Sequence, residues 1–528
     1  MLSSLDNFVI GLYLVLLVSA AYYISSRKPS AEMSSEDYFL AGKSLPWWAI
    51  GASLIAANIS AEQIIGQSGQ GFVLGLAIAA YEWQAAIVLI IVAKFMLPIF
   101  LKNKIYTMPQ FLEQRFGSEI KVLMAVFWLV LYTAVNLTAI LWLGALAITT
   151  LTGVSINVGL VSLAALAILY SIYGGLRAVA FTDIIQVVVL ILGGIIITLI
   201  ALGQVGGDSG VVGGLSTLMS EVPGHFRMIF SADSPHYQAL PGIWTLLGGL
   251  WVLHFSYWGF NQYIIQRALA AESVQEAQKG LVFAAGLKLL IPLIVVIPGI
   301  AALWLAQNGA LDYDSLSAKP DSTYGVLIGL VPEGIRGVVF AALIAAILSS
   351  LASMVNSIST IFTMDMYRGY IKKEAEESHY VFVGRVCSVV AMTIAVFLAK
   401  PFVGNMESAF QLIQEYTGFV APGIVSVFLL GMFWPKCTKQ AAFAMLLISV
   451  LANIAMKLAY PDVAFVIRIW GVFLACLAAG YFVSVFKKEE AQAAIADLSG
   501  VSFRTSTGFN HASLVITSIL VLIYVVFW

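Results

Sequence analysis

The chain has 528 residues, of which 60% are hydrophobic and only 10% are charged, and its formal net charge is −1. Soluble domains carry about 25% charged residues, so this composition indicates a polytopic membrane protein and argues against a nucleic-acid partner. Cys387, Cys437 and Cys476 fall in or beside apolar segments. We expect them to be inert packing residues, because a disulfide framework is implausible there.

Apolar segments long enough to cross about 30 Å of hydrocarbon recur along the whole chain. The first, residues 5–25, has no basic stretch before it and is followed by Arg27 and Lys28, which predicts an uncleaved first helix whose N-terminus lies outside. We predict about fourteen spans, at residues 5–25, 47–72, 75–101, 119–149, 155–172, 178–203, 241–267, 276–306, 334–364, 379–400, 404–433, 439–458, 463–485 and 508–527.

Lysine and arginine gather in alternate connections between these spans, which predicts that those connections face the cytoplasm. The longest connections, residues 204–240 and 307–333, are nearly free of them, so both chain ends are predicted to face outward. The basic residues on the predicted cytoplasmic side are Arg27, Lys28, Lys43, Lys102, Lys104, Arg115, Lys121, Arg368, Lys372, Lys373, Arg385, Lys436, Lys439, Lys487, Lys488 and Arg504.

One apolar segment, residues 53–63, is interrupted midway by Asn58, Ser60, Glu62 and Gln63. A glutamate at that depth is costly, and small residues mixed with Asn and Ser suit a helix that unwinds where it lines a cavity. The alternative is a polar seam that joins one helix to its neighbour. Four polar residues so close together favour a broken helix at a binding site.

Four further motifs mark the chain. Residues 36–48 are a polar segment that ends in Pro and two Trp, and we expect it to be an interfacial anchor. A short interfacial helix is predicted at residues 106–116, which begin Tyr-Thr-Met-Pro-Gln-Phe. Residues 170–176 (Tyr-Ser-Ile-Tyr-Gly-Gly-Leu) predict a tight cytoplasmic turn. At residues 253–258, His, Ser and two aromatic residues interrupt another apolar run.

Together with the segment Ala-Ala-Asn-Ile-Ser-Ala-Glu-Gln at 56–63, these motifs resemble the sodium/solute symporter family nearly from end to end. Residues 257–267 and 413–418 narrow the resemblance to its sodium–glucose/galactose cotransporter branch. That likeness implies an all-α, leucine-transporter-type fold of two inverted five-helix halves, each beginning with an interrupted helix. Within one transmembrane domain (1–528), the expected parts are an extra helix at 5–25, repeats at 47–203 and 241–433, and added helices at 439–527.

Glu82 and Lys288 each lie mid-span in apolar surroundings. They could be a structural pair that satisfies itself, or a carboxylate and an ammonium that bind sugar hydroxyls, which donate and accept at once. Tyr257 and Trp258 could cover the apolar face of a pyranose or pack a helix interface. The resemblance implies that Tyr257 is an inner gate, and the full expected substrate site is Asn58, Gln63, Tyr81, Glu82, Ala85, His254, Tyr257, Trp258, Lys288 and Gln414.

Two of these positions depart from the pattern of the galactose-transporting member of the branch. Ala85 stands where a serine is expected, and His254 stands where an asparagine is expected. The departures leave the identity of the sugar open while keeping the mode of binding.

The same resemblance implies a sodium site built from five neutral oxygens. These are the hydroxyls of Ser349 and Ser350 and the carbonyls of Ala56, Ile59 and Ala346. Neutral oxygens suit a monovalent cation, because a divalent ion would normally require carboxylates. Ala352 offers no hydroxyl for a second site, so one sodium ion per sugar is expected.

Asp183 lies near the predicted cytoplasmic start of its span. It is expected to be either a carboxylate at a helix N-terminus, favoured by the helix dipole, or a relay point for departing sodium. Glu62, Lys94 and Glu415 also lie in spans, and we assign them no specific role.

The resulting prediction is a sodium-driven symporter of a neutral monosaccharide, galactose or glucose, that works by alternating access in the inner membrane and catalyses no covalent chemistry. Alternatives are a symporter of the same fold for a polyol such as myo-inositol or for a carboxylate such as proline or pantothenate, and a sugar sensor that does not transport. Against a carboxylate stands the absence of any mid-span arginine near either interruption.

Overall fold

The computed structural model describes residues 2–25, 40–404, 409–486 and 498–528, and every element in them is helical. The first half contains α1 (Ser4–Ser25), η2 (Ala41–Lys43), α3 (Trp47–Asn58), η3 (Glu62–Gly66), α4 (Gln67–Leu74), η4 (Gly75–Ala79), α5 (Ala80–Ile91), η5 (Val92–Met96), α6 (Leu97–Lys102), α7 (Met108–Phe116), α8 (Ser118–Val130), η6 (Leu131–Leu137), α9 (Thr138–Thr152), α10 (Ile156–Gly206), η7 (Gly207–Ser209), α11 (Gly210–Glu221) and η8 (Pro223–Phe226).

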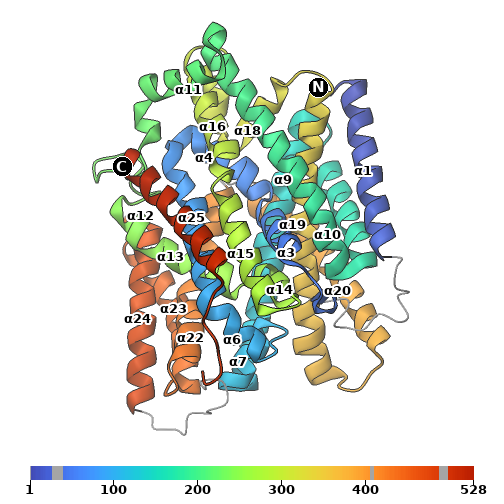
Figure 1. Ribbon diagram of the computed structural model, residues 1–528, viewed down its shortest axis with the longest axis vertical. Coiled ribbons are helices and arrows are strands. Elements are labelled where there is room, and N and C mark those ends of the chain that lie inside the picture. Colours follow the sequence, from blue (N-terminus) through green and yellow to red (C-terminus); the bar gives the residue numbers. More distant parts are fainter. Residues whose placement is uncertain (1, 26–39, 405–408, 487–497) are drawn as a thin grey trace.

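The remaining elements form the rest of the bundle in Figure 1. They are α12 (Ile243–Leu247), α13 (Gly249–His254), η9 (Phe255–Gly259), α14 (Gln262–Leu269), α15 (Val274–Lys288), α16 (Ile291–Gln307), α17 (Tyr313–Ala318), η10 (Pro320–Ser322), α18 (Thr323–Gly329), α19 (Ile335–Thr360), η11 (Ile361–Ile371), α20 (Glu377–Val403), α21 (Ala409–Gly418), α22 (Ala421–Phe433), α23 (Lys439–Ala459), α24 (Phe465–Phe486) and α25 (Thr507–Val526).

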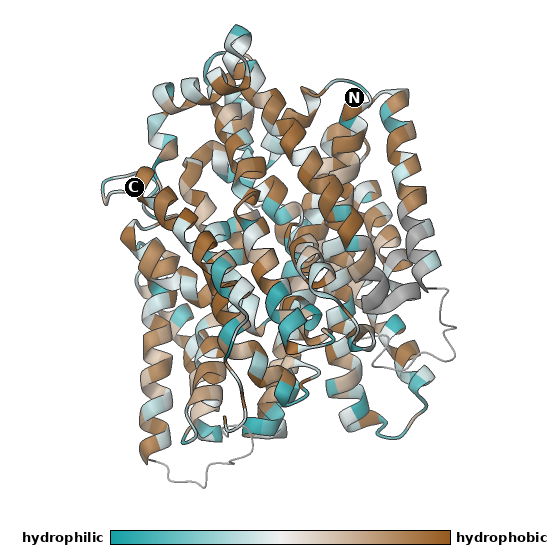
Figure 2. Ribbon diagram, viewed as in Figure 1, coloured by the Kyte–Doolittle hydropathy of each residue, from teal (hydrophilic) through white to brown (hydrophobic). Residues whose placement is uncertain are grey.

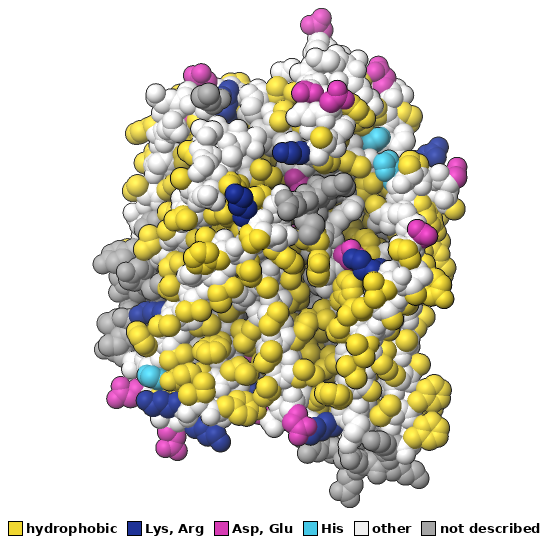
Figure 3. Space-filling view, turned by 180° about the vertical axis from the view of Figure 1, so that it is seen from behind, with side chains coloured by type: hydrophobic (Ala, Val, Ile, Leu, Met, Phe, Trp, Pro, Cys, Tyr) yellow, Lys and Arg dark blue, Asp and Glu magenta, His cyan; other side chains and the backbone are white. Residues whose placement is uncertain are grey.

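The exterior of the bundle is apolar over most of its height. Hydrophobic residues colour most helices brown in Figure 2, and in Figure 3 a broad yellow surface separates charged groups near the two ends. In the described part of the chain, nine helices are long and apolar enough to cross a membrane, or ten if the bent pair α21 and α22 is one span. The chain is therefore a multi-pass membrane protein, and the count of about fourteen spans stays a prediction.

The predicted break in the first interrupted helix is confirmed. Helix α3 ends at Asn58, Ile59 has a non-helical ψ of 86°, and the chain resumes as a π-helix, η3, at Glu62. The amide of Ser60 donates to the carbonyl of Asn58 at 2.9 Å instead of continuing the α-helical pattern. Ala56 thereby loses the amide that a continuing helix would offer to its carbonyl.

The second interruption lies a few residues later than the sequence predicts. The backbone stays helical through residues 253–258, as the end of α13 and the π-helix η9, and it breaks at Phe260 and Asn261. Asn261 then caps α14 by accepting from the amide of Tyr263 at 3.2 Å. A π-helix keeps backbone bonds while displacing side chains, which explains why polar residues are tolerated before the break itself.

Two neighbouring predictions concern loops. The short interfacial helix with an early proline is confirmed as α7, where Thr107 caps the amide of Gln110 at 3.2 Å. The tight turn at residues 170–176 is wrong as a break in the helix, because the spans predicted at 155–172 and 178–203 fall within one helical element, α10. Most side chains from 170 to 179 lie outside the described residues.

The arrangement of the ends agrees with the alternation of basic residues. The N-terminus and α11 lie at one end of the molecule, and α7, which carries Arg115, lies at the opposite end (Figure 1). Arg27, Lys28, Lys487 and Lys488, and residues 36–39 of the polar segment, lie outside the described residues. Which end faces the cytoplasm stays a prediction.

Close packing between α4 and α16 holds the helix that follows the first break. A Cβ added to Gly299 of α16 would lie 2.2 Å from the carbonyl oxygen of Ser68 in α4. Only glycine allows the two backbones this approach, a common device where membrane helices must pack tightly. The half-helix that follows the break is thus held firmly against α16.

Candidate functional site

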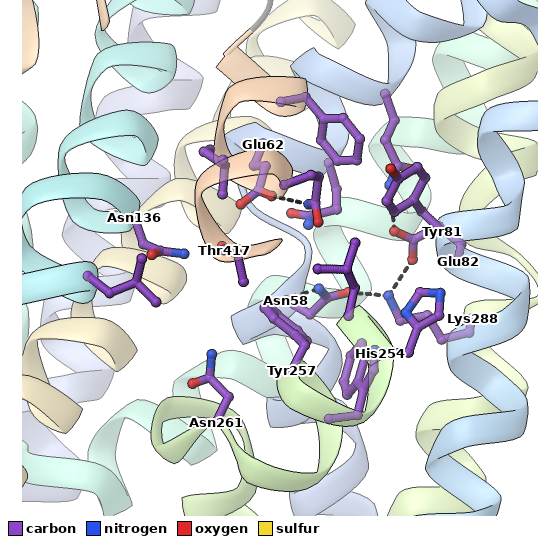
Figure 4. A pocket seen from close by; sticks show the side chains of 18 residues that line it. Asn58, Glu62, Tyr81, Glu82, Asn136, His254, Tyr257, Asn261, Lys288 and Thr417 are labelled. Carbon is purple, nitrogen blue, oxygen red and sulfur yellow. Dashed lines mark hydrogen bonds and ion pairs between the residues drawn. The ribbon is translucent and has the colours of Figure 1, made fainter. Parts of the chain in front are cut away.

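The two breaks and four further helices, α5, η6, α15 and α21, enclose one polar cavity (Figure 4). Its lining residues are Asn58, Glu62, Gln63, Gln67, Tyr81, Glu82, Leu131, Asn136, Leu253, His254, Tyr257, Trp258, Asn261, Lys288, Phe410, Ile413, Gln414 and Thr417. Every predicted substrate residue except Ala85 is among them. Ala85 is fully buried on α5 but does not line the cavity.

A chain of hydrogen bonds centred on Lys288 joins three helices across the cavity. The Lys288 ammonium donates to a carboxylate oxygen of Glu82 and to Oδ1 of Asn58. Glu82 also accepts from Nε2 of Gln67 at 2.7 Å, and the amide of Asn58 donates to the Tyr257 hydroxyl at 3.1 Å. The Glu82–Lys288 pair is thus satisfied within the protein and also borders the cavity, so a structural role and a sugar-binding role both stay predictions.

Aromatic rings close this network. The Lys288 ammonium lies 4.7 Å from the ring centroid of Trp258, a cation–π contact, and the Tyr257 and Trp258 rings meet edge to face at 5.1 Å. The Tyr257 hydroxyl also contacts the hydroxyl of Tyr263. Next to Glu82 on α5, Tyr81 packs edge to face on Phe410 at 5.2 Å (Figure 4).

The amide residues of the predicted site are also engaged. Oε1 of Gln63 accepts from the amide and the hydroxyl of Ser60, at 3.1 and 2.9 Å, which folds the side chain back onto the first break. Gln414 on α21 donates to Oε1 of Glu62 at 3.0 Å. Glu62, to which the sequence assigned no role, therefore belongs to the cavity wall.

Glu415 and Lys94, which also had no assigned role, lie outside the cavity lining. Glu415 pairs with Lys457 at 2.9 Å and with Arg468 at 2.8 Å, away from the cavity. Lys94 lies over the ring of Phe95 at 5.5 Å and is partly exposed. Among the described residues, the cavity lining that sequence reasoning missed comprises Gln67, Leu131, Asn136, Leu253, Asn261, Phe410, Ile413 and Thr417, besides Glu62.

The cavity is small: the space that the centre of a water-sized sphere can occupy is about 50 Å³. One water needs about 10–15 Å³ on that measure, so this space matches only a few waters. A pyranose would fill more. Binding a solute of that size requires the side chains of the Lys288 network to move apart, and the ligand must replace the hydrogen bonds that they give up.

The two helices that carry the predicted sodium ligands, α3 and α19, meet at the end of α3. The Ser350 hydroxyl on α19 donates to the carbonyl of Ala57 at 2.8 Å, next to Ala56 and one turn from Ala346 on its own helix. The Ser349 hydroxyl turns instead to Oδ1 of Asp183, at 2.5 Å. Only one of the two hydroxyls thus faces the first break in this structure, and the full ligand set stays a prediction.

Asp183 is not at a helix N-terminus, so that interpretation is wrong. It lies inside α10, is fully buried, accepts from Ser53 and Ser349 at 2.5 Å each, and pairs with Arg267 at 3.4 Å. The Arg267 guanidinium also donates to Ser53 at 2.6 Å and to Ser353. Arg267, at the end of its predicted span, is an arginine near the interruptions, but it does not line the cavity and its charge is paired with Asp183.

A membrane bundle in which two interrupted helices face one central polar cavity is the architecture of a secondary transporter. The family model of the sodium:solute symporter family matches residues 38–449. The chain is 48% identical to a sodium/glucose cotransporter of Vibrio parahaemolyticus over 100% of its own length and 99% of that protein. It is 32% identical to a human sodium/myo-inositol cotransporter, over 84% of this chain and 65% of that protein.

The chain belongs to the sodium:solute symporter family. Its fold matches that of a substrate-bound, outward-open sodium-coupled sialic acid symporter with a TM-score of 0.80 at 22% identity, covering 92% of this chain and 98% of that one. This confirms the all-α, leucine-transporter-type fold. The protein is accordingly a sodium-coupled transporter and not an enzyme; the boundaries of the two repeats stay predictions.

Proposed function

We propose that the protein couples the movement of sodium to the uptake of a neutral monosaccharide, galactose or glucose, across the bacterial inner membrane by alternating access. The observation that carries this proposal is the Glu82–Lys288–Asn58 network on the cavity wall, which offers donors and acceptors to hydroxyl groups. The sodium/glucose cotransporter of Vibrio parahaemolyticus supports the choice of sugar.

The charge of the cavity favours a neutral solute. Its lining holds two carboxylates, Glu62 and Glu82, and one ammonium, Lys288, whereas Arg267 is bound to Asp183 outside it. A carboxylate solute would find no free cation in this lining, because Lys288 is already paired with Glu82. This disfavours proline and pantothenate, while myo-inositol, which is neutral and rich in hydroxyls, remains the second candidate because of the human relative.

Sodium would bind between the end of α3 and α19, through Ala56, Ile59, Ala346, Ser349 and Ser350. The hydrogen bond from Ser350 to Ala57 supports this, because it brings that helix pair into contact beside the first break. Asp183, bonded to Ser349, would act as the relay for departing sodium. Both chain ends would face outward, as the basic connections predict.

Counterflow in proteoliposomes tests the proposal. Vesicles preloaded with unlabelled galactose, glucose, myo-inositol, proline or pantothenate would be diluted into the labelled solute with sodium on both sides. We expect accumulation of labelled galactose or glucose with sodium, and none with choline. Counterflow of myo-inositol alone would move the assignment to the polyol, and sodium-dependent sugar binding without any counterflow would indicate a sensor.

A further inference from the structure

The cavity wall includes an asparagine that has no role in the predicted site and whose side-chain oxygen has no hydrogen-bond partner. Asn136 on η6 lines the cavity, is only 5% exposed, and its Oδ1 is unpaired. Buried carbonyl oxygens are nearly always satisfied in native proteins, by protein groups, by water or by a ligand. An unpaired acceptor that borders a binding cavity therefore indicates a ligand atom that donates to it.

The local backbone explains how Asn136 reaches the cavity. Positions five apart in an α-helix diverge by about 140° around its axis, so Leu131 and Asn136 would not share a face. Residues Leu131–Leu137 form a π-helix, η6, whose wider turn is closed by bonds between positions five apart. Both Leu131 and Asn136 consequently line the cavity.

Asn136 lies on the opposite side of the cavity from the charged network. In Figure 4, Asn58 and Tyr257 occupy the middle, with Glu82, Lys288 and His254 on one side and Asn136, Thr417 and Asn261 on the other. The middle pair is itself joined by a hydrogen bond of 3.1 Å. We call the side that carries Asn136, Thr417 and Asn261 the neutral half of the cavity; Glu62, the remaining carboxylate of the lining, lies above the middle (Figure 4).

Hydrogen bonds of a neighbouring tyrosine hold the neutral half in place. The hydroxyl of Tyr132, also on η6, donates to Oδ1 of Asn261 at 2.6 Å and accepts from the amide of Gln262 at 3.0 Å. The π-helix is thereby tied to the second break. Asn136 is held beside residues that border the Tyr257 gate, with no charged group among them.

We propose that Asn136 is a solute-contacting residue that accepts a hydrogen bond from one hydroxyl of the transported sugar, and that with Thr417 and Asn261 it forms a neutral compartment of the site. This inference rests on the proposed sugar transport. A solute that contacts both halves must separate Asn58 from Tyr257, so the neutral compartment is reached as the gate opens. The hydroxyl bound there would be distinct from those bound by Glu82 and Lys288.

Equilibrium binding to the purified full-length protein, at saturating sodium, tests the assignment. The sugar that the wild type transports and each of its singly deoxygenated analogues would be measured with wild type and Asn136→Leu. We expect Asn136→Leu to weaken binding of the parent sugar about tenfold, the effect of one hydrogen bond. One deoxy analogue should bind both proteins equally, because it already lacks the hydroxyl in question.

Thr133→Val is the matched control. Thr133 lies on the same π-helix but borders an apolar groove on its other face, so its loss should leave sugar affinity unchanged. If Asn136→Leu fails to fold, as judged by thermal unfolding, Asn136→Ser replaces it, with the same expectation for the analogues.

An unchanged affinity for the parent sugar in the Asn136 variant would overturn the inference. So would an equal loss for the parent sugar and every analogue, which would mark Asn136 as structural. The proposed function fails separately, if the wild type binds no sugar in sodium.

Discussion

Two acid–base pairs are buried at the centre of the molecule, and their surroundings differ. Glu82 and Lys288 border the cavity and share their hydrogen bonds with the amides of Asn58 and Gln67. Asp183 and Arg267 lie outside the cavity and are enclosed by the hydroxyls of Ser53, Ser349 and Ser353. On the proposed function, the first pair would exchange its partners for ligand hydroxyls, and we call it the open pair; the second, which does not line the cavity, we call the closed pair.

The closed pair and the serines around it join four helices. Its members lie on α10 and α14, and the serines around it lie on α3 and α19, the two helices expected to hold sodium. Removing one member of a buried pair leaves the other charge uncompensated. The comparison therefore predicts a loss of stability from the closed pair and a loss of affinity from the open pair.

Arg267→Met should have the largest effect. We expect it to destabilise the fold by about 3–5 kcal/mol, because Asp183 remains charged and buried without its cation. The measurement is the unfolding temperature of the purified protein together with its yield. The double variant Arg267→Met and Asp183→Asn should recover much of the loss.

The control for that variant is Lys279→Met, which breaks the exposed pair with Glu276 on one helix. Exposed pairs contribute about 0.2–1 kcal/mol, so little change is expected. An unfolding temperature for Arg267→Met equal to that of the wild type would show that the closed pair is no brace.

Glu82→Gln should have the next largest effect, on binding instead of folding. The change keeps the shape of the side chain but removes the charged acceptor, and hydrogen bonds to charged groups contribute about 1.5–3 kcal/mol. Sugar affinity should fall about ten- to a hundredfold. Isothermal or fluorescence titration in sodium measures it, with Glu113→Gln, on α7 and away from the cavity, as the control. Equal affinities for Glu82→Gln and wild type would remove Glu82 from the sugar site.

The open pair was predictable from the sequence, and the neutral half of the cavity was not. Glu82 and Lys288 stand out because a charge within an apolar span is rare and costly. Asn136 does not stand out, because Asn356 and Asn453 are equally buried in apolar helices and lie outside the cavity. Only the π-helical turn of η6 brings Asn136 to the cavity, and no residue pattern announced that turn.

The positions of the two helix breaks were also only partly predictable from the sequence. The first was placed correctly because its polar residues lie at and directly beside the unwound ones, Ile59 and Ser60. The second was placed too early, because π-helix η9 carries polar and aromatic residues without breaking. Arg267 is visible in the sequence, but its partner Asp183 is distant in the chain. The pairing of the two charges could therefore be seen only in the fold.

Ser350→Ala should have a smaller effect, confined to sodium. Losing one neutral oxygen should raise the sodium concentration for half-maximal sugar binding about tenfold, with normal yield. Because binding is reciprocal, sugar affinity should fall at low sodium and recover at saturating sodium. Ser388→Ala, a buried serine on α20 bonded within its own helix, is the control.

Sugar binding measured over a series of sodium concentrations, with choline holding ionic strength constant, gives both the half-maximal sodium concentration and the sugar affinity of Ser350→Ala. The curve should be hyperbolic if one ion is bound per sugar. Sodium activation identical to that of the wild type would exclude the Ser350 hydroxyl as a ligand.

The smallest effects concern the two positions that depart from the galactose-transporting pattern, and here the structure separates residues that the sequence treated alike. His254 lines the cavity, and its Nε2 is buried without a partner. His254→Asn should therefore change the ratio of galactose to glucose affinity about two- to tenfold, since one neutral hydrogen bond contributes about 0.5–1.5 kcal/mol. Ala85→Ser should leave that ratio unchanged, because Ala85 does not face the cavity. Competition of unlabelled sugars against labelled uptake measures both ratios. A shift produced by Ala85→Ser but not by His254→Asn would mean that the solute-bound cavity has a different wall, with α5 turned toward the sugar.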